Sequence, residues 1–329
     1  MTRRGSPRPI EEREFHRWLA RHLPSGRDPL LPLGDDVAAI PLGGRRVLLL
    51  TTDALSEGTH FRRESDPYEI GQATAAVSLS DLAAKGGSPA AGLLDLLLPP
   101  GTPRRWAERV VEGAERFGRR FGAPVVGGDT KPAAGRAVVG TYIGFGRADR
   151  LAPRHGARPG DWVVVTGTVG AGGRAALGLQ RPSTRHRALS ALLHVEPRVA
   201  AGQRLVRWAH AMTDTSDGLA AAAHLVAEAS HVRMVIDEAQ IPWDSGLPST
   251  DSERDRRLAV GLFGGDYELL TTMPPNRCPT ARRALRQLGL KLTPVGVVLP
   301  GRGAWLRSPD SPLRPMPAPG WDPFHPKAP

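Results

Sequence analysis

Residues 68–100 read YEIGQATAAVSLSDLAAKGGSPAAGLLDLLLPP, and this stretch decides the fold class. Its first part, Tyr68 to Lys85, is rich in alanine and predicts a helix. Residues 92–98 form a short apolar run that is typical of a buried strand. Pro99 and Pro100 end this strand, because proline has no backbone N–H to donate to a sheet. A helix followed closely by a buried strand indicates a mixed α/β protein.

The alternation of helices and strands continues on both sides of this stretch. Before residue 149 we predict a helix around 15–19, strands at 47–50 and 137–145, and a helix at 103–121. After residue 161 we predict strands at 162–165, 232–236, 267–272 and 295–298, and helices at 174–179, 198–210, 218–229 and 281–288. The polar segment 149–161 contains two prolines and two glycines, so we expect the domain boundary there. The sequence thus predicts an α/β (α+β) fold with two domains, residues 1–149 and 150–329.

Length and composition suit a folded protein with two cores. The chain has 329 residues, of which 40% are apolar and 23% are charged. The longest apolar runs, such as 93–98, are much shorter than a membrane span. No apolar segment of a secretory signal follows the basic residues 1–4. Cys278 is the only cysteine, which excludes an internal disulfide and a thiolate metal cluster. We therefore expect a cytoplasmic protein with no membrane partner.

The net charge of +11 allows two interpretations. One is a nucleic-acid partner, and the other is a basic surface that attracts phosphorylated small molecules. The arginines are spread over the whole chain, without a dense basic tract or interleaved aromatic residues. This distribution favours the second interpretation, so we expect no nucleic-acid partner.

Several aspartates follow apolar strands or open helices, usually beside glycine, serine or threonine. They are Asp35, Asp36, Asp53, Asp81, Asp129, Asp214, Asp217 and Asp266. Each of them alone is more often a helix cap or a turn residue. The set as a whole indicates magnesium, a hard cation that binds through a few carboxylates and substrate phosphates. Neighbouring hydroxyls can complete the coordination, and neighbouring glycines let the backbone approach phosphates closely.

Other kinds of site have less support. The glycine-rich turn at 167–173 could bind an anion at a helix N-terminus, but a plain tight turn explains it equally well, and no Walker A lysine follows. His60, His155 and His224 lack metal-ligand spacing, which argues against zinc. No Gly-x-Ser-x-Gly nucleophile motif is present.

Eight segments, taken in order, resemble the thiamine-monophosphate kinases of the AIR-synthetase-like ATP-binding superfamily. They are GDDVAAI (34–40), LLLTTDALSEGTHF (48–61), IGQATAAVSLSDLAAKGGSP (70–89), VVGGDT (125–130), RHGARPGDWVVVTGTVG (154–170), MTDTSDGLAAAAHLVAEAS (212–230), LFGGDYELL (262–270) and GWDPF (320–324). The resemblance implies an AIR-synthetase-like fold of two domains, in which the N-terminal sheets of two protomers pair in a homodimer. It also implies that ATP phosphorylates thiamine monophosphate to thiamine diphosphate with the help of several Mg²⁺ ions.

The resemblance further implies a role for each matching residue. The magnesium set would be Asp36, Thr51, Thr52, Asp53, Asp81, Asp129, Asp214 and Asp217. Gly128, Asp129, Arg154 and Ser216 would contact ATP. His60 and Trp321 would contact the substrate, with the Trp321 indole stacking on the thiamine. We expect direct in-line transfer of the phosphoryl group, with no catalytic nucleophile from the protein.

The sequence departs from the family pattern at three places. Asp266 follows Gly264-Gly265 where the family has a substrate-binding glutamate before the aspartate, so Asp266 could replace that contact. Ser78 stands where asparagine is usual, and Lys85 stands where the family has an apolar residue. Two alternatives therefore stay open at this point. One is an ATP-dependent enzyme of the same superfamily with another phosphorylated acceptor, and the other is a non-catalytic ATP-binding homologue.

Overall fold

The computed structural model describes residues 10–23, 30–309 and 311–317. Its described strands form one sheet of five strands and one of seven. The first sheet uses strands up to Arg147, and the second begins at Trp162. The short helix α1 (Glu12–His22) precedes both. The predicted α/β class with two AIR-synthetase-like halves is confirmed.

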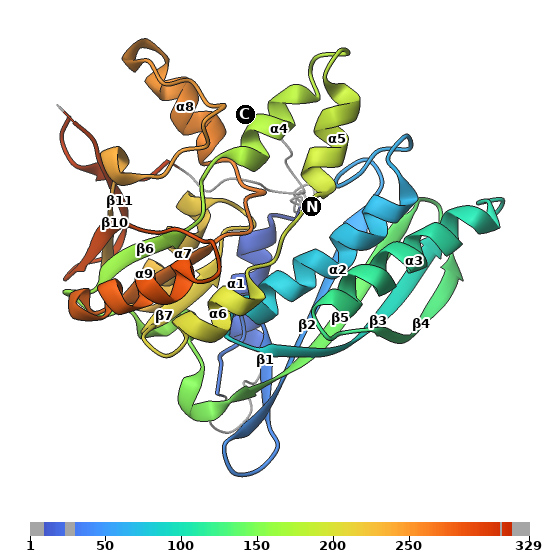
Figure 1. Cartoon of the computed structure of the whole chain (residues 1–329), viewed down its shortest axis with the longest axis horizontal. Helices are drawn as coiled ribbons and strands as arrows, with labels where there is room; N and C mark the ends of the chain where they lie inside the picture. The colour runs from blue at the N-terminus through green and yellow to red at the C-terminus, as the bar shows by residue number, and fades with distance from the viewer. Residues whose placement is uncertain (1–9, 24–29, 310, 318–329) are drawn as a thin grey trace, which may run out of the picture.

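The first sheet has the strand order β1-β2-β5-β3-β4. Its strands are β1 (Ala38–Pro41), β2 (Arg46–Ser56), β3 (Ser88–Leu98), β4 (Val125–Pro132) and β5 (Ala137–Arg147). Helices α2 (Pro67–Ala84) and α3 (Arg104–Arg120) cover one face of it (Figure 1). Helix α2 begins where the Asp66 carboxylate accepts a hydrogen bond from the Tyr68 N–H at 2.9 Å, as an N-cap does.

The other face of this sheet carries apolar side chains that are open to solvent in a single chain. Successive strand residues point to opposite faces of a sheet. Leu94 and Gly144 are buried on the face that α2 and α3 cover, so their neighbours Leu93 and Phe145 point to the other face. Leu93 is 44% exposed and Phe145 is 40% exposed. Among the described residues, α2 and α3 are the helices that pack against this sheet, and both lie on the opposite face.

The second sheet has the strand order β12-β11-β8-β10-β6-β9-β7. Its strands are β6 (Trp162–Thr166), β7 (Ala211–Asp214), β8 (Arg233–Asp237), β9 (Leu269–Met273), β10 (Leu292–Leu299), β11 (Gly303–Arg307) and β12 (Arg314–Pro315). The helices of this half are α4 (Ala171–Gly178), α5 (Arg185–Leu193), α6 (Val199–Leu205), α7 (Leu219–Ala229), α8 (Arg254–Gly261) and α9 (Cys278–Arg286). Helix α7 packs on β7, β8 and β11.

One continuous apolar core joins the two halves. It includes residues of the first sheet and of α2, such as Leu49 and Leu79, together with residues of the second half, such as Leu205 and Met212. Helix α2 contacts α5, α6 and β7 as well as its own sheet, and Figure 1 shows it running across the junction between the halves. This position explains why an alanine-rich helix is buried on nearly every side. No helix in the described ranges is long and apolar enough to span a membrane.

Several predicted elements differ from the structure at their ends. The helix expected at 198–210 ends at Leu205, and the strand expected at 267–272 begins at Leu269. Strands β1, β4, β7, β11 and β12 and helices α5 and α8 were not predicted. Strand β7 has only four residues, and most of β4 is exposed and contains two glycines. Neither of them carries the alternation that marks a half-buried strand.

Candidate active site

Three aspartates from distant parts of the chain meet at the junction of the two halves. Asp36, Asp81 and Asp214 each place one carboxylate oxygen within 4.8 Å of the others. Asp36 precedes β1, Asp81 lies in the last turn of α2, and Asp214 ends β7. Asp53 of β2 lies close enough for its charge to raise the pKa of Asp81. Together these four residues are called the acidic cluster below.

Hydroxyl groups hold three of these carboxylates in place. The donors and acceptors are Thr51 Oγ1 to Asp81 (2.6 Å), Ser78 Oγ to Asp53 (2.7 Å), Ser80 Oγ to Asp214 (2.6 Å) and Ser216 Oγ to Asp214 (2.9 Å). A hydroxyl can fix a carboxylate but brings no positive charge. The three carboxylates therefore remain available to a cation.

The electrostatics of the acidic cluster call for such a cation. Burial raises the pKa of Asp53, the hydrogen bond from Ser78 partly opposes this, and the charge of Asp214 adds to it, so that the pKa is about 6. Burial, and then the charges of Asp53, Asp214 and Asp36, hold the pKa of Asp81 well above its usual range. The pKa of Asp214 is raised by burial and by the charge of Asp36. Because all the donors are hard oxygen atoms, the arrangement fits Mg²⁺ better than a soft metal.

Asp36 differs from the other three because cations of the chain itself already face it. The Arg154 guanidinium pairs with Asp36 Oδ1, donates to the Gly34 carbonyl at 2.6 Å and donates to Thr213 Oγ1 at 3.2 Å. Burial alone would raise the pKa of Asp36, but the charges of Arg154 and Lys85 outweigh it and lower the pKa to about 2. Arg154 therefore lies beside the acidic cluster, where it can also meet an anionic substrate.

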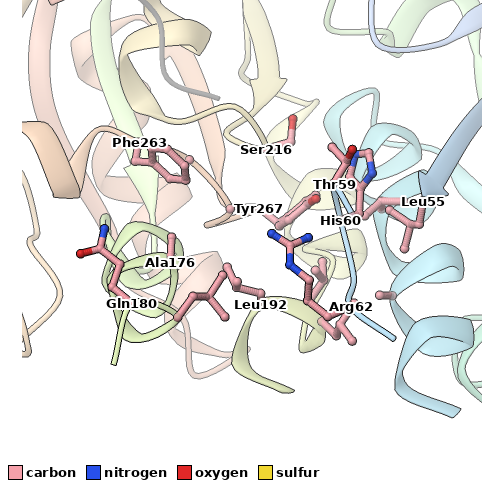
Figure 2. A pocket seen from close by; sticks show the side chains of 17 residues that line it. Leu55, Thr59, His60, Arg62, Ala176, Gln180, Leu192, Ser216, Phe263 and Tyr267 are labelled. Atoms are coloured by element: carbon pink, nitrogen blue, oxygen red, sulfur yellow. The ribbon is translucent and has the colours of Figure 1, made fainter. Parts of the chain in front are cut away.

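A cavity of about 300 Å³ opens next to the acidic cluster. Figure 2 shows Leu55, Thr59 and His60 on one side, Phe263, Ala176 and Gln180 on the other, and Ser216, Tyr267, Leu192 and Arg62 between them. Ser216 both lines the cavity and donates to Asp214, so the cavity reaches the acidic cluster. Of the described residues that line it, Arg62 alone carries a formal charge, and its guanidinium points toward Tyr267 (Figure 2).

His60 lines this cavity as a neutral imidazole. Burial, and then the charge of Arg62, lowers its pKa. The Ser56 N–H donates to His60 Nδ1 at 3.1 Å, so the ring proton lies on Nε2. Trp321, the other predicted substrate contact, lies outside the described residues.

The Asp266 side chain points to the glycine-rich turn at 167–173 and not into the cavity around His60. Its carboxylate accepts hydrogen bonds from the Gly170 N–H at 2.8 Å and the Gly172 N–H at 3.0 Å. The group that accepts hydrogen bonds at the glycine-rich turn is therefore the chain's own Asp266 carboxyl, whose pKa burial raises to about 7. Asp266 lines a second, neighbouring cavity and is not among the residues around His60.

The remaining predicted residues are not all gathered at the acidic cluster. Asp217 lies near Tyr267, whose pKa is raised first by burial and then by the charges of Asp214, Asp53, Asp217 and Asp81. Thr52 points to the open face of the sheet, where its hydroxyl meets Thr141 Oγ1 at 2.9 Å. Asp217 thus shares Tyr267 as a neighbour with the acidic cluster, and Thr52 lies on the opposite side of β2.

Gly128 and Asp129 lie on the edge strand β4. The Asp129 side chain is 56% exposed and pairs with Lys131 at 3.2 Å. A Cβ atom at Gly128, whose φ is +153°, would come within 1.9 Å of the Leu94 carbonyl oxygen. The close approach of β3 is thus a sufficient reason for glycine at this position.

The sequence analysis missed residues that the structure places at the site. These are Arg62, Phe263 and Tyr267, which line the cavity. Asp35, already listed among the aspartates, and Lys85, already noted as a departure from the family pattern, lie behind Asp36. Tyr267 has a positive φ of 52°, which is uncommon for a residue other than glycine. Its position after Gly264-Gly265 was an available signal, because paired glycines often mark a strained loop at a functional site.

The raised pKa values of the acidic cluster predict that magnesium binds more weakly in acid. Between pH 3.8 and about 6 the folded protein holds a proton on Asp53 that the unfolded chain has lost. The free energy of unfolding without metal should therefore fall as the pH rises through this window. Magnesium must displace such protons, so the Mg²⁺ concentration that gives half of the rise in Tm should increase from about pH 8 to about pH 5.5.

Thermal unfolding with Mg²⁺ titrated at each pH would measure this. Asp53→Asn should reduce the pH dependence, because it removes one of the titrating carboxylates. A midpoint that stays constant over the whole range would contradict the raised pKa values.

Comparison with known proteins agrees with this geometry. Residues 34–146 match the family described as AIR synthase related protein, N-terminal domain, and residues 158–306 match its C-terminal domain. The thiamine-monophosphate kinase of Synechococcus elongatus is 32% identical over 299 residues, which cover 83% of this chain and 88% of that protein. The Escherichia coli thiamine-monophosphate kinase is 34% identical over 290 residues, with 85% and 87% covered.

Solved structures give the same result. A structure described as AaThiL complexed with AMPPCP and TMP has a TM-score of 0.78 at 28% identity, covering 94% of this chain and 99% of that one. The thiamine-monophosphate kinase of Stenotrophomonas maltophilia has a TM-score of 0.73 at 31% identity, with 86% and 92% covered. In sequence and in fold, this chain belongs to the thiamine-monophosphate kinase family.

Proposed function

We propose that this enzyme transfers the γ-phosphoryl group of ATP to the phosphate of thiamine monophosphate, giving ADP and thiamine diphosphate. The observation that carries the proposal is the acidic cluster beside the cavity that holds His60 and Arg62. Family membership and the relative described as complexed with AMPPCP and TMP support it. We also propose that the reaction takes place in the cytoplasm, where ATP is available as the donor.

The acidic cluster would hold the magnesium ions. Asp53, Asp81 and Asp214 offer carboxylates that accept hydrogen bonds from hydroxyls, and Asp36 offers lone pairs beside Arg154. Bound Mg²⁺ would supply positive charge against the phosphates of donor and acceptor. The hydroxyls of Thr51, Ser78 and Ser80 would keep the carboxylates in position while the phosphates arrive.

The chain needs no general base or nucleophile for this reaction. A phosphate monoester has a second pKa of about 6, so its oxygen is ionised at neutral pH. That oxygen forms a bond to the γ-phosphorus while the bond to the β–γ bridging oxygen breaks, and ADP leaves. Repulsion between anions dominates the barrier, and Arg154 would reduce it beside the cluster. Ser216 would contact ATP from the cavity edge.

The acceptor would lie in the cavity. Apolar side chains such as Leu55, Leu192 and Phe263 suit the thiamine rings, and Arg62 suits a phosphate oxygen. His60 would donate from Nε2 as a neutral group. Trp321 would stack on the thiamine, as the GWDPF segment suggests. Asp266 would act indirectly, by holding the turn at Gly170 and Gly172.

The function is tested by incubating the purified protein with ATP, Mg²⁺ and thiamine monophosphate. We expect equal amounts of ADP and thiamine diphosphate, and none of either product in excess chelator. Binding of ATP without thiamine diphosphate formation would mean that the acceptor is another phosphorylated compound.

Arg62→Gln should raise the KM for thiamine monophosphate about tenfold or more, because it removes one charge-assisted hydrogen bond. The KM for ATP should stay nearly unchanged. Arg63→Gln is the matched control, since Arg63 is exposed and does not line the cavity. Trp321→Ala should act on the same parameter as Arg62→Gln. Equal increases in the KM values for ATP and thiamine monophosphate would show that Arg62 supports the fold and does not contact the acceptor.

We also propose a homodimer, in which a second copy covers the open face of the first sheet. Exposed apolar residues such as Leu93 and Phe145 support this assembly. Thr52, Gly128 and Asp129, which lie away from the cluster, would then reach ATP and its magnesium at the interface between protomers. Light scattering should give twice the 35.2 kDa of one chain, and Leu93→Asp should shift the mass towards one chain. A wild-type mass of 35.2 kDa at micromolar concentration would contradict the proposal.

A further inference from the structure

Lys85 is a buried cation within a shell of four oxygen atoms. It follows the last residue of α2, and its side chain is 0% exposed. Its Nζ lies 2.6 Å from Asp35 Oδ1 and 2.7 Å from Asp36 Oδ2. The backbone oxygens of Met212 and Ala152 lie at 2.6 Å and 3.0 Å. Four oxygens surround a group with three N–H donors, which is the coordination shell of a small cation.

The oxygens around Lys85 come from segments far apart in the sequence. Asp35 and Asp36 precede β1, and Met212 lies in β7. In the sequence, Ala152 lies between the last strand of the first sheet and the first strand of the second. Any cation in this shell therefore ties the loop before β1 to the second half of the protein. Since Asp36 Oδ2 faces Lys85 and Oδ1 faces Arg154, the orientation of Asp36 is fixed from both sides.

The local charges balance without a metal. Asp35 and Asp36 carry two negative charges, and Lys85 and Arg154 carry two positive charges. The other carboxylates of the acidic cluster face hydroxyl groups instead. The apolar side chain that the family pattern has at position 85 would leave these four oxygens facing hydrocarbon, which is costly without a partner.

We propose that Lys85 is a positioning residue that acts as a tethered monovalent cation. It occupies a cation site built from Asp35, Asp36, Ala152 and Met212, and it holds Asp36 ready for magnesium before the metal arrives. Lys85 acts through Asp36 and touches no reacting atom. The magnesium part of this inference rests on the proposed function, whereas the monovalent cation site stands on the oxygen shell alone.

Lys85→Ala tests the proposal in the full-length protein, because it empties the shell and leaves room for a free ion. Thermal unfolding is followed with Mg²⁺ titrated in choline chloride, NaCl, KCl or NH₄Cl at equal ionic strength. In choline chloride, the Mg²⁺ midpoint should rise about tenfold to a hundredfold, as for loss of other groups that orient metal ligands. KCl or NH₄Cl should move it back towards the wild-type value, because K⁺ and NH₄⁺ are close in size to the lysine ammonium. The wild type and the exposed-lysine control Lys291→Ala should respond alike in all four salts.

Lys85→Met keeps the test decisive if the alanine variant does not fold, because methionine fills the space of the lysine stem. Its Mg²⁺ midpoint should rise to a similar extent, without recovery in KCl. A wild-type midpoint in the variant that folds would overturn the proposal. A loss in Lys85→Ala that is identical in all four salts would also overturn it, because Lys85 would then only support packing. No step of this test needs turnover. If the protein made no thiamine diphosphate, the proposed function would be wrong, but the role of Lys85 would still be decided by the Mg²⁺ midpoints.

Discussion

Replacing Asp53 or Asp81 with asparagine should lower kcat about a hundredfold to a thousandfold, the usual effect of removing one electrostatic contact to the transition state. The amide keeps the shape of the carboxylate but brings no negative charge to the magnesium ion. The fold should survive, because both carboxylates are hydrogen bonded to neutral hydroxyls that can also pair with an amide. The measurement is steady-state turnover with saturating ATP and thiamine monophosphate.

A second readout separates loss of metal from loss of structure. Burial and mutual repulsion raise the pKa of both groups, so each ionised carboxylate strains the folded state. In chelator, Tm should therefore stay the same or rise in both variants, while the increase in Tm that Mg²⁺ gives should shrink. Asp149→Asn is the control, because it changes a surface carboxylate that is 40% exposed. It should leave both the Tm in chelator and the increase in Tm with Mg²⁺ unchanged. Near-normal turnover in both Asp53→Asn and Asp81→Asn would show that these aspartates do not bind the magnesium ion.

Arg154→Ala should destabilise the protein by about 3–5 kcal/mol, the usual cost of removing one partner of a buried ion pair. The Arg154 side chain is 17% exposed, while Asp36 is fully buried and would keep only Lys85 as a cation. We also expect a higher KM for ATP, because a cation beside the phosphates is lost. Urea unfolding and steady-state kinetics measure the two effects.

Arg154→Lys should restore little of this stability. One ammonium is a single point charge, whereas the guanidinium reaches Asp36, Gly34 and Thr213 at once. Arg158→Ala is the matched control, because Arg158 is exposed four residues further along the same segment. A free energy of unfolding within about 1 kcal/mol of wild type in Arg154→Ala would show that Asp36 does not depend on this pair.

Much of the acidic cluster could be predicted because strand ends and glycine-rich turns are visible in a sequence. Asp36, Asp81 and Asp214 were selected in this way, and the structure brings them within 4.8 Å. Thr51 and Thr52 show where such reasoning needs geometry. Neighbouring strand residues point to opposite faces, so Thr51 reaches Asp81 and Thr52 reaches Thr141.

The partners of Asp266 and Lys85 could not be predicted, because they lie far away in the sequence. The N–H that binds Asp266 is 96 residues earlier, and the carbonyl of Met212 is 127 residues after Lys85. A lysine at the end of a helix is normally exposed, and only the packing of α2 between the two sheets buries this one. Local patterns predicted the elements and the type of chemistry, but not the contacts between the halves.

The apolar core shared by both halves, with α2 running through it, limits how this family can be recombined. Helix α2 of the first half packs against α5, α6 and β7 of the second half, so each half carries a surface that fits the other. A chimaera that joins the first half of one relative to the second half of another would bring together side chains that never adapted to each other. A chimaera joined within residues 149–161 would therefore need compensating changes along α2.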